Sequence, residues 1–265
     1  MTPLYSLVAD TGERFDYVLA NPPFEKKSSM TFTNEEREQE KDDLTCNRQD
    51  FWARTSNKQL NFVQHIRTML KTTGCAAVVV PDNVLFEGGA GEPIRRKLLK
   101  NTDLHTILRL PTGVFYAQGV KANVIFFDNR EASPDPWTKE VWYYDYRTNI
   151  HHTLKKKPMR YEHLSDFIEC YNPRNRHRRK ATWDEQDTPE GRWRSYSYEE
   201  LTARDKTSLD VFWLKDKSLV IWTTCRNRTN SPSRSSRTWR LGLTAFGRCW
   251  RLTGWPMPSS TPPGC

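Results

Sequence analysis

Short apolar runs alternate with segments of helical period through the first half of the chain. Phe15–Leu19 and Cys75–Val80 are predicted strands, and the second, which has no charged position, is typical of a sheet covered on both faces. Between them, Gln59–Lys71 places apolar residues at helical spacing, and Gly74 is expected to end that helix. The pattern therefore predicts a strand, a helix and a second strand in succession.

The same alternation continues along the chain. Further predicted elements are a helix at Pro93–Lys100, strands at Leu104–Leu110, Val120–Asp128 and Thr138–Tyr146, and a short helix with a strand within Arg192–Asp216. A short helix is also expected near Asn34–Lys41, inside a long polar excursion. This alternation predicts an α/β fold with a largely parallel sheet, in which ligands bind beyond the carboxyl ends of the strands.

Composition excludes several classes of protein. The 265 residues are 36% hydrophobic and 28% charged, which leaves room for one large domain or two small ones with a packed core. The longest apolar runs are too short to cross a bilayer, and the first residues show no signal-peptide pattern. Six cysteines without a Cys-x-x-Cys pair predict neither a metal site nor a disulfide framework, so a cytoplasmic protein is expected.

The formal charge of +9 is concentrated at one end of the chain. Residues 218–265 hold seven arginines and no lysine, aspartate or glutamate, so the other 217 residues carry 34 basic and 32 acidic side chains. The charge of these 217 residues therefore does not by itself predict that they bind nucleic acid. Arg174–Lys180 is the strongest basic patch outside the tail, so Arg174 and Arg176 are candidate DNA contacts, as is Lys121; plain surface is the alternative for the run.

The tetrad Asn21-Pro22-Pro23-Phe24 follows the first predicted strand, and its two prolines stop the strand from continuing. An adenine amino group is a poor nucleophile because its lone pair is delocalised into the ring. The Asn21 side-chain oxygen and the Pro22 carbonyl could accept hydrogen bonds from both amino protons, while Phe24 could stack on a base extruded from the duplex. A strand-ending turn with Phe24 in the core is the alternative.

Longer motifs carry a resemblance from Gly12 to about Leu219. They are FDYVLANPPF, SNKQLNFVQHIRTMLKTTG, AAVVVPDNVLFEGGAGEPIR, DLHTILRLPTGVFYAQGVKANVIFFDN and WTKEVWYYDYRTNIHHTLKK. With them the chain resembles the methylase (modification) subunit of type I restriction–modification systems, an adenine-N6 DNA methyltransferase. The resemblance implies that Asn21 and Pro22 hold the target amino group beside S-adenosylmethionine, that Pro23 sets the geometry and that Phe24 stacks on the flipped adenine. Glu25 departs from the family, which usually has Gly there, and its carboxylate would repel DNA phosphate or crowd the loop.

The resemblance also implies what the chain lacks. The family binds S-adenosylmethionine through a Gly-rich loop upstream of the tetrad, yet 20 residues precede Asn21 and none forms such a loop. Gly88–Gly91 lies late in the chain and is interpreted as a flexible loop. The expectation is a partial, doubly wound, mostly parallel sheet of the methyltransferase type without its first strands. Phe15–Leu19 would then be an open edge, and the chain alone would be poorly soluble and would transfer no methyl group.

Three segments are expected: the C-terminal portion of an adenine-N6 DNA methylase domain at 1–150, a C-terminal extension at 151–219, and an out-of-frame, disordered tail at 220–265. One allowed back-translation of Val220–Pro256, read two bases later, encodes an acidic string with apolar residues at helical spacing. A frameshift that replaced an acidic amphipathic helix is therefore our hypothesis, and a native Arg/Ser/Thr-rich arm is the alternative.

The expected partners, by resemblance, are DNA, the specificity subunit and the restriction subunit of a type I system. Two other classes of function stay open. One is a non-catalytic remnant or interaction module that docks to a specificity subunit. The other is a nucleic-acid-binding protein driven by the arginine tail, in which case deletion of Ser218–Cys265 would abolish binding.

Overall fold

The computed structural model describes residues 12–24, 29–33, 39–43, 48–115 and 119–216. Glu25 and the predicted tail at 220–265 lie outside these residues. The chain divides into two compact units: the first takes 1–109, 121–143 and 195–213, and the second takes 110–120, 144–194 and 214–265. The expected segment boundaries at residues 150 and 219 stay predictions.

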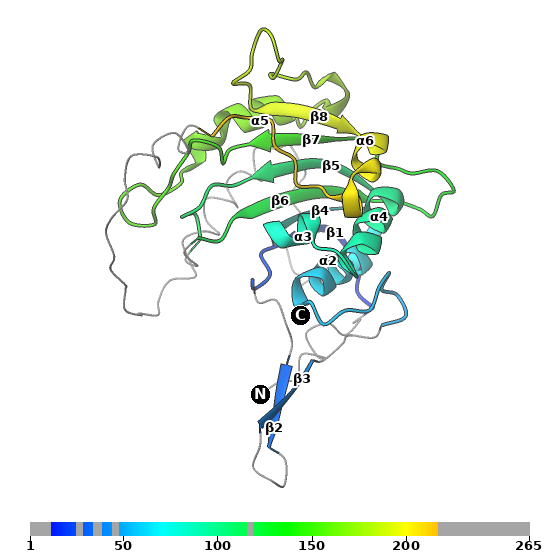
Figure 1. The fold of residues 1–265 in the computed structure, drawn as a ribbon. Helices are drawn as coiled ribbons and strands as arrows, with labels where there is room; N and C mark the ends of the chain where they lie inside the picture. The colour runs from blue at the N-terminus through cyan, green and yellow to red at the C-terminus, as the bar shows by residue number, and fades with distance from the viewer. Residues whose placement is uncertain (1–11, 25–28, 34–38, 44–47, 116–118, 217–265) are drawn as a thin grey trace, which may run out of the picture. The chain divides into compact units, whose positions relative to one another are not determined.

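The elements are drawn in Figure 1. The strands are β1 (Phe15–Ala20), β2 (Ser29–Thr33), β3 (Gln39–Asp43), β4 (Leu70–Pro81), β5 (Thr102–Arg109), β6 (Ala122–Asn129), β7 (Glu140–Asp145) and β8 (Trp193–Ser197). The helices are α2 (Lys58–Met69), α3 (Asp82–Phe86), α4 (Gly91–Asn101), α5 (Ser165–Tyr171) and α6 (Tyr198–Ala203), with 3-10 turns η1 (Tyr161–Leu164), η2 (Arg176–Arg178) and η3 (Asp205–Thr207).

Six strands form one sheet in the order β1-β4-β6-β5-β7-β8, which confirms the predicted α/β class. β1 pairs with β4 in parallel, and β6 is antiparallel to both β4 and β5. The strands β1, β4 and β5 therefore run in one direction, with β6 inserted against them. As a result, their carboxyl ends and the beginning of β6 meet at the same edge, which we call the carboxyl edge; the opposite ends form the amino edge.

β1 lies at the end of the strand order, as the sequence predicted for Phe15–Leu19. Among the described residues its ladder runs to β4 alone, from Phe15 opposite Leu70 to Ala20 opposite Val78. Phe15 is 42% exposed and Leu19 is 45% exposed. By contrast, all eight residues of β6 are buried, so the centre of the sheet is covered on both faces.

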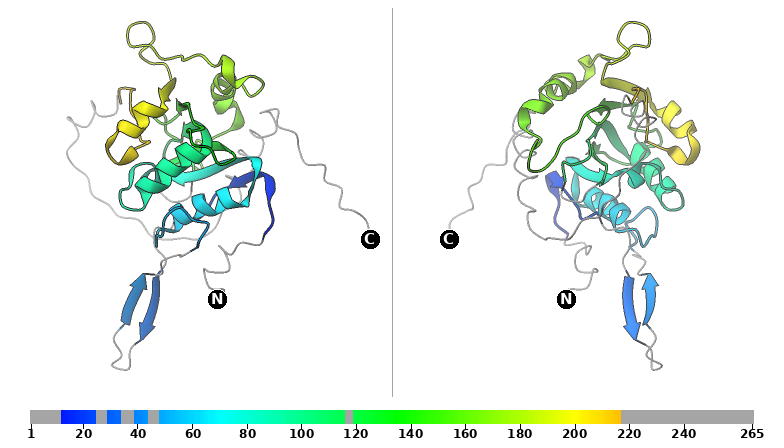
Figure 2. Two further views of the ribbon diagram at one scale, coloured as in Figure 1. Left: turned by 90° about the vertical axis from the view of Figure 1, so that its right-hand side faces the viewer. Right: turned by 60° about the vertical axis from the view of Figure 1, so that its left-hand side comes forward.

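The helix α2 forms for local reasons that the sequence shows. Asn57 caps it, because its side-chain oxygen accepts hydrogen bonds from the backbone N–H groups of Gln59 and Leu60. Its apolar positions Leu60, Val63 and Ile66 are buried in the core. In Figures 1 and 2, α2 and α4 lie side by side against the sheet.

Gly74 was predicted to end this helix, and that prediction is wrong. α2 ends at Met69, and Gly74 lies inside β4. A Cβ atom at Gly74 would lie 2.7 Å from the carbonyl oxygen of Phe15, so glycine is needed where β1 approaches β4 most closely.

The helix expected near Asn34–Lys41 is also corrected. Gln39–Asp43 forms β3, which pairs antiparallel with β2; residues 34–38 lie outside the described part of the chain. The other elements agree with the sequence to within a few residues. A strand followed by a short helix within Arg192–Asp216 is confirmed by β8 and α6.

The second unit has an aromatic core of its own. The ring of Phe167 on α5 lies 5.4 Å from that of Tyr144 and 6.3 Å from that of Trp193. The centre of the Tyr171 ring lies 5.6 Å from the centre of the Phe167 ring. These rings explain why a segment with little aliphatic sequence is nevertheless compact.

Candidate functional site

The tetrad follows directly after β1 at the carboxyl edge. Since Ala20 pairs with Val78, Asn21 is the first residue past the ladder. Asn21 and Pro23 are exposed, whereas Pro22 and Phe24 are half-buried. Among the described residues, neither the Asn21 side chain nor the Pro22 carbonyl has a hydrogen-bond partner. Within the described part of the chain, two acceptors on adjacent residues therefore have no partner at the end of a strand.

The neighbouring strand adds a polar pair to the same edge. β4 leads into Asp82, the first residue of α3, whose Oδ1 accepts a hydrogen bond of 2.8 Å from Nδ2 of Asn123. Asn123 is fully buried near the start of β6. The Asp82 backbone N–H also donates to the Lys121 carbonyl at 3.1 Å, and the Lys121 side chain is exposed. The structure therefore brings Lys121, a predicted DNA contact, to the edge that carries the tetrad.

Sequence reasoning did not identify Asp82 and Asn83 as residues of the candidate site. Asn83 donates from Nδ2 to Gln59 Oε1 at 2.8 Å and to Glu87 Oε2 at 3.0 Å. Asn57 donates to the same Glu87 oxygen at 3.0 Å. This network joins the start of α2 to the end of α3. Its signal in the sequence was available: Pro-Asp-Asn directly follows an apolar strand that runs parallel to the strand before the tetrad.

Gly91, the last residue of the glycine cluster Gly88–Gly91, packs against a buried arginine. A Cβ atom on Gly91 would lie 2.8 Å from a guanidinium nitrogen of Arg95. Arg95 is buried and donates to the carbonyls of Val84, Glu87, Lys206 and Thr207 at 2.7–3.0 Å. Burial lowers the pKa of Arg95 to about 10, against the raising effect of Glu92 and Glu87. Gly91 therefore makes room for a structural arginine, and the cluster does not follow a strand directly, so it does not fit the nucleotide-binding loop of an α/β sheet.

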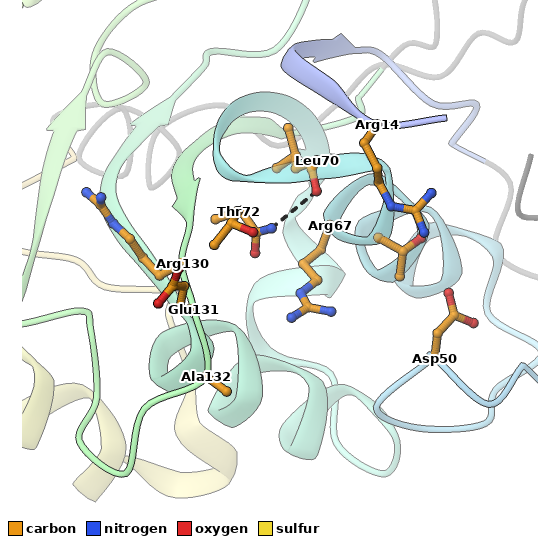
Figure 3. Close-up of a pocket in the computed structure, with 10 residues that line it drawn as sticks. Arg14, Asp50, Arg67, Leu70, Thr72, Arg130, Glu131 and Ala132 are labelled. Atoms are coloured by element: carbon orange, nitrogen blue, oxygen red, sulfur yellow. Dashed lines mark hydrogen bonds between the residues drawn. The ribbon is translucent and has the colours of Figure 1, made fainter. Parts of the chain in front are cut away.

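A polar cavity of about 430 Å³ lies at the amino edge (Figure 3). It is lined by charged and polar side chains and a few apolar ones from the starts of β1 and β4, the end of β6 and α2: Arg14, Asp50, Arg67, Thr68, Leu70, Thr72, Asn129, Arg130, Glu131 and Ala132. Burial lowers the pKa of Arg67, and the carboxylate of Asp50 acts in the opposite direction. The cavity is at the other end of the strands from the tetrad, so it does not form part of the candidate site.

The basic run Arg174–Lys180 belongs to the second unit, and its arginines differ in how far they are exposed to solvent. Arg174 is exposed and Arg176 is half-buried. Arg179 is buried: its Nε donates to the Tyr171 carbonyl at 2.7 Å, and its guanidinium lies 4.5 Å from the centre of the Tyr171 ring. The run is therefore not a uniform patch, because Arg179 stabilises the aromatic core.

The described residues show neither a metal-binding cluster nor a membrane-spanning helix. No group of three or more His, Cys, Asp or Glu side chains comes together there as a set of metal ligands. Within the same residues, every helix is too short or too polar to span a bilayer.

Comparisons with known proteins agree with one another. The family model described as N-6 DNA Methylase matches residues 4–206. The EcoKI type I restriction enzyme methylase subunit of Escherichia coli is 40% identical over 227 residues, and the StySPI methylase subunit of Salmonella potsdam is 40% identical over 229. Each match covers 77% of this chain and 40% of the relative, so the chain spans about two fifths of these relatives' length.

Solved structures give the same result. The crystal structure of the EcoKI M protein is 34% identical, with a TM-score of 0.62 over 93% of this chain and 50% of that chain. A structure from a study of complex assembly and conformational transition of the type I R-M system is 27% identical. Its TM-score is 0.53 over 82% of this chain and 42% of that chain.

Proposed function

Since this chain belongs to the N-6 DNA methylase family, we propose that its tetrad holds the 6-amino group of an adenine in DNA, within a methylase subunit of a type I restriction–modification system. The observation that carries the proposal is the pair of acceptors at the end of β1, the Asn21 side-chain oxygen and the Pro22 carbonyl. Hydrogen bonds from both amino protons to neutral oxygens favour a pyramidal nitrogen, whose lone pair is then available for attack on a methyl group.

The other two tetrad residues fit the same task. Pro23 restricts the backbone, so the direction of the Pro22 carbonyl is fixed before the base arrives. Phe24 is half-buried, which supports a ring held by the protein on one side and stacked on a flipped adenine on the other. Aromatic stacking would replace part of the stacking energy that the base loses on leaving the duplex.

S-adenosylmethionine is the methyl donor implied by the family, and Asn21 and Pro22 would lie beside it. The described residues do not complete a site for it, because the cluster Gly88–Gly91 does not follow a strand directly and Gly91 packs against Arg95. We therefore assign no step to donor binding by this chain. The exposed apolar side chains of Phe15 and Leu19 support a further strand beside β1, and a segment that pairs there would supply the donor site.

The proposed partners are DNA, a specificity subunit that reads its sequence and a restriction subunit, in the cytoplasm. Lys121, Arg174 and Arg176 would contact DNA phosphate. The alternative function is a non-catalytic module that docks to the specificity subunit. Under that alternative, the tetrad would show no preference for adenine.

The test is binding of short oligonucleotides that differ by one amino group. One probe carries a single adenine among thymines, and the second carries purine, which lacks the 6-amino group, at the same position. We expect the full chain to bind the adenine probe several-fold more tightly, because each hydrogen bond contributes about 1 kcal/mol. Asn21→Ala should remove the preference, and Asn101→Ala, at the end of α4, should keep it.

A second measurement addresses activity. With radiolabelled S-adenosylmethionine and DNA, the chain alone is expected to transfer no methyl group. Equal affinity of the native chain for the two probes would contradict the proposed role of the tetrad, and methyl transfer by the purified chain would contradict the incomplete donor site.

A further inference from the structure

Arg109 and Phe212 form a rigid pair at the carboxyl edge. Arg109 is the last residue of β5, and its side chain is 1% exposed. Its guanidinium donates to Asp210 Oδ1 at 2.9 Å and to the Val211 carbonyl. These two bonds fix the segment that leads to Phe212, and the ring of Phe212 has its centre 4.2 Å from Arg109 Cζ.

Phe212 is 66% exposed, the largest exposed fraction among the large apolar side chains that the structure describes as exposed. One face of the ring lies over the guanidinium, so the exposed area belongs to the other face and the ring edges. An aromatic ring that is packed on one face and exposed on the other loses little conformational entropy when a planar ligand stacks on its exposed face. The geometry is that of a stacking platform.

The surroundings favour a nucleic acid as the ligand. The exposed side chain of Arg204 donates to the carbonyls of Ser208 and Asp210, at 2.9 and 2.8 Å, so a second guanidinium lies beside the same segment. β5 is three positions from β1 in the sheet, which corresponds to about 14 Å at the usual strand spacing. One strand of duplex DNA advances about 3.4 Å per nucleotide and an unstacked strand advances further, so a few nucleotides span that distance.

We infer that Phe212 stacks on an unpaired nucleobase that flanks the adenine held by the tetrad. This inference rests on the proposed function, because it takes DNA as the ligand. Every base presents an aromatic face, so the contact would add affinity without sequence preference. It would hold the DNA near the carboxyl edge while the target base is out of the stack.

The experiment uses the full chain and two fluorescein-labelled probes, read by fluorescence anisotropy. One probe is a run of about twelve thymidines, a length within the usual site size. The other has the same backbone and charge but abasic positions throughout. Trp137 supplies the matched control, because it is also exposed and has the guanidinium of Arg130 at 5.7 Å, but it lies in the loop after β6, which ends at the amino edge.

Phe212→Ala is expected to weaken binding of the thymidine probe about tenfold and to leave binding of the abasic probe unchanged. Phe212→Tyr and Trp137→Ala should bind the thymidine probe as tightly as the native chain does. Phe212→Leu should bind it as weakly as Phe212→Ala does. The melting temperature of each variant shows whether it folds. Unchanged thymidine binding in Phe212→Ala would overturn the inference and leave a protein partner as the occupant, and an equal loss with both probes would also overturn it.

The thymidine probe contains no adenine, so the two proposals fail separately. Phe212-dependent binding without any preference of the chain for adenine over purine contradicts the role of the tetrad alone. Adenine preference that depends on Asn21, together with an inert Phe212, contradicts the stacking platform alone. A chain that binds neither the thymidine probe nor the adenine probe contradicts both proposals.

Discussion

Both edges of the sheet hold polar pairs within the chain, and they differ in what lies beside those pairs. At the amino edge Lys71 lies 2.8 Å from Asp16. At the carboxyl edge Arg109 lies 2.9 Å from Asp210, but the Asn21 side chain has no partner among the described residues. An acceptor without a partner directly after a strand favours ligand binding at the carboxyl edge.

The largest expected effect on stability compares two arginines that lie beside exposed aromatic rings, Arg109 at the carboxyl edge and Arg130 at the amino edge. Arg109 is 1% exposed and Arg130 is 34% exposed. Arg109→Leu should lower the free energy of unfolding by about 3 kcal/mol, because it removes buried hydrogen bonds and leaves Asp210 without its guanidinium. Arg130→Leu should cost less, about 1–2 kcal/mol, because its own side chain is partly solvated while the buried carboxylate of Asp128 loses one charged partner. Urea unfolding measures both, and equal losses would remove the distinction between the edges.

The two asparagines of β6 give a second, smaller effect. Asn123 donates to Asp82 at the carboxyl edge, and Asn129 donates to the carbonyls of Leu70 and Lys71 at the amino edge. Each change to Ala should cost about 1–2 kcal/mol of stability, because a buried hydrogen bond is lost. Only Asn123→Ala is expected to weaken oligonucleotide binding as well. If Asn129→Ala weakens it equally, binding does not distinguish the edges.

The smallest effect concerns two exposed lysines. Lys121 lies at the carboxyl edge, whereas Lys71 is paired with Asp16 at the amino edge. Lys121→Gln should reduce the salt dependence of DNA binding by roughly one phosphate contact, a change of about 0.9 in the slope of log K against log salt concentration. Lys71→Gln should leave the slope unchanged. Titrations at several salt concentrations measure this, and an effect of Lys71→Gln alone would reverse the assignment.

Local pattern was sufficient for most elements of the six-stranded sheet and for the helices α2 and α4, but not for β3, where a helix was predicted. Cys75–Val80 could be identified as a buried strand because its apolar run is continuous, and α2 because its apolar positions recur at helical spacing. The insertion of β6 between β4 and β5 was not predictable from those runs, because pairing depends on which neighbours bury which face. Gly74 was misassigned for the same reason: the contact that requires glycine is with Phe15, far away in the sequence.

The candidate site was predictable only in part. The tetrad is contiguous, so its residue types and the strand before it indicate a base-holding turn. Asp82 could have been added from its position after β4. The pairing of Arg109 with Asp210 and Phe212 could not, because about a hundred residues separate them and no local pattern joins them.

Within the part of the chain that the structure describes, β1 is held by one ladder and β6 by two. A protein that added a strand to the outer side of β1 would restrain Asn21 without touching it. Attachment of that neighbour and capture of the base would then be linked by a coupling free energy. By reciprocity, DNA bound at the turn would increase the affinity for the added strand by the same factor. Attachment of the neighbour and binding of DNA would then each strengthen the other.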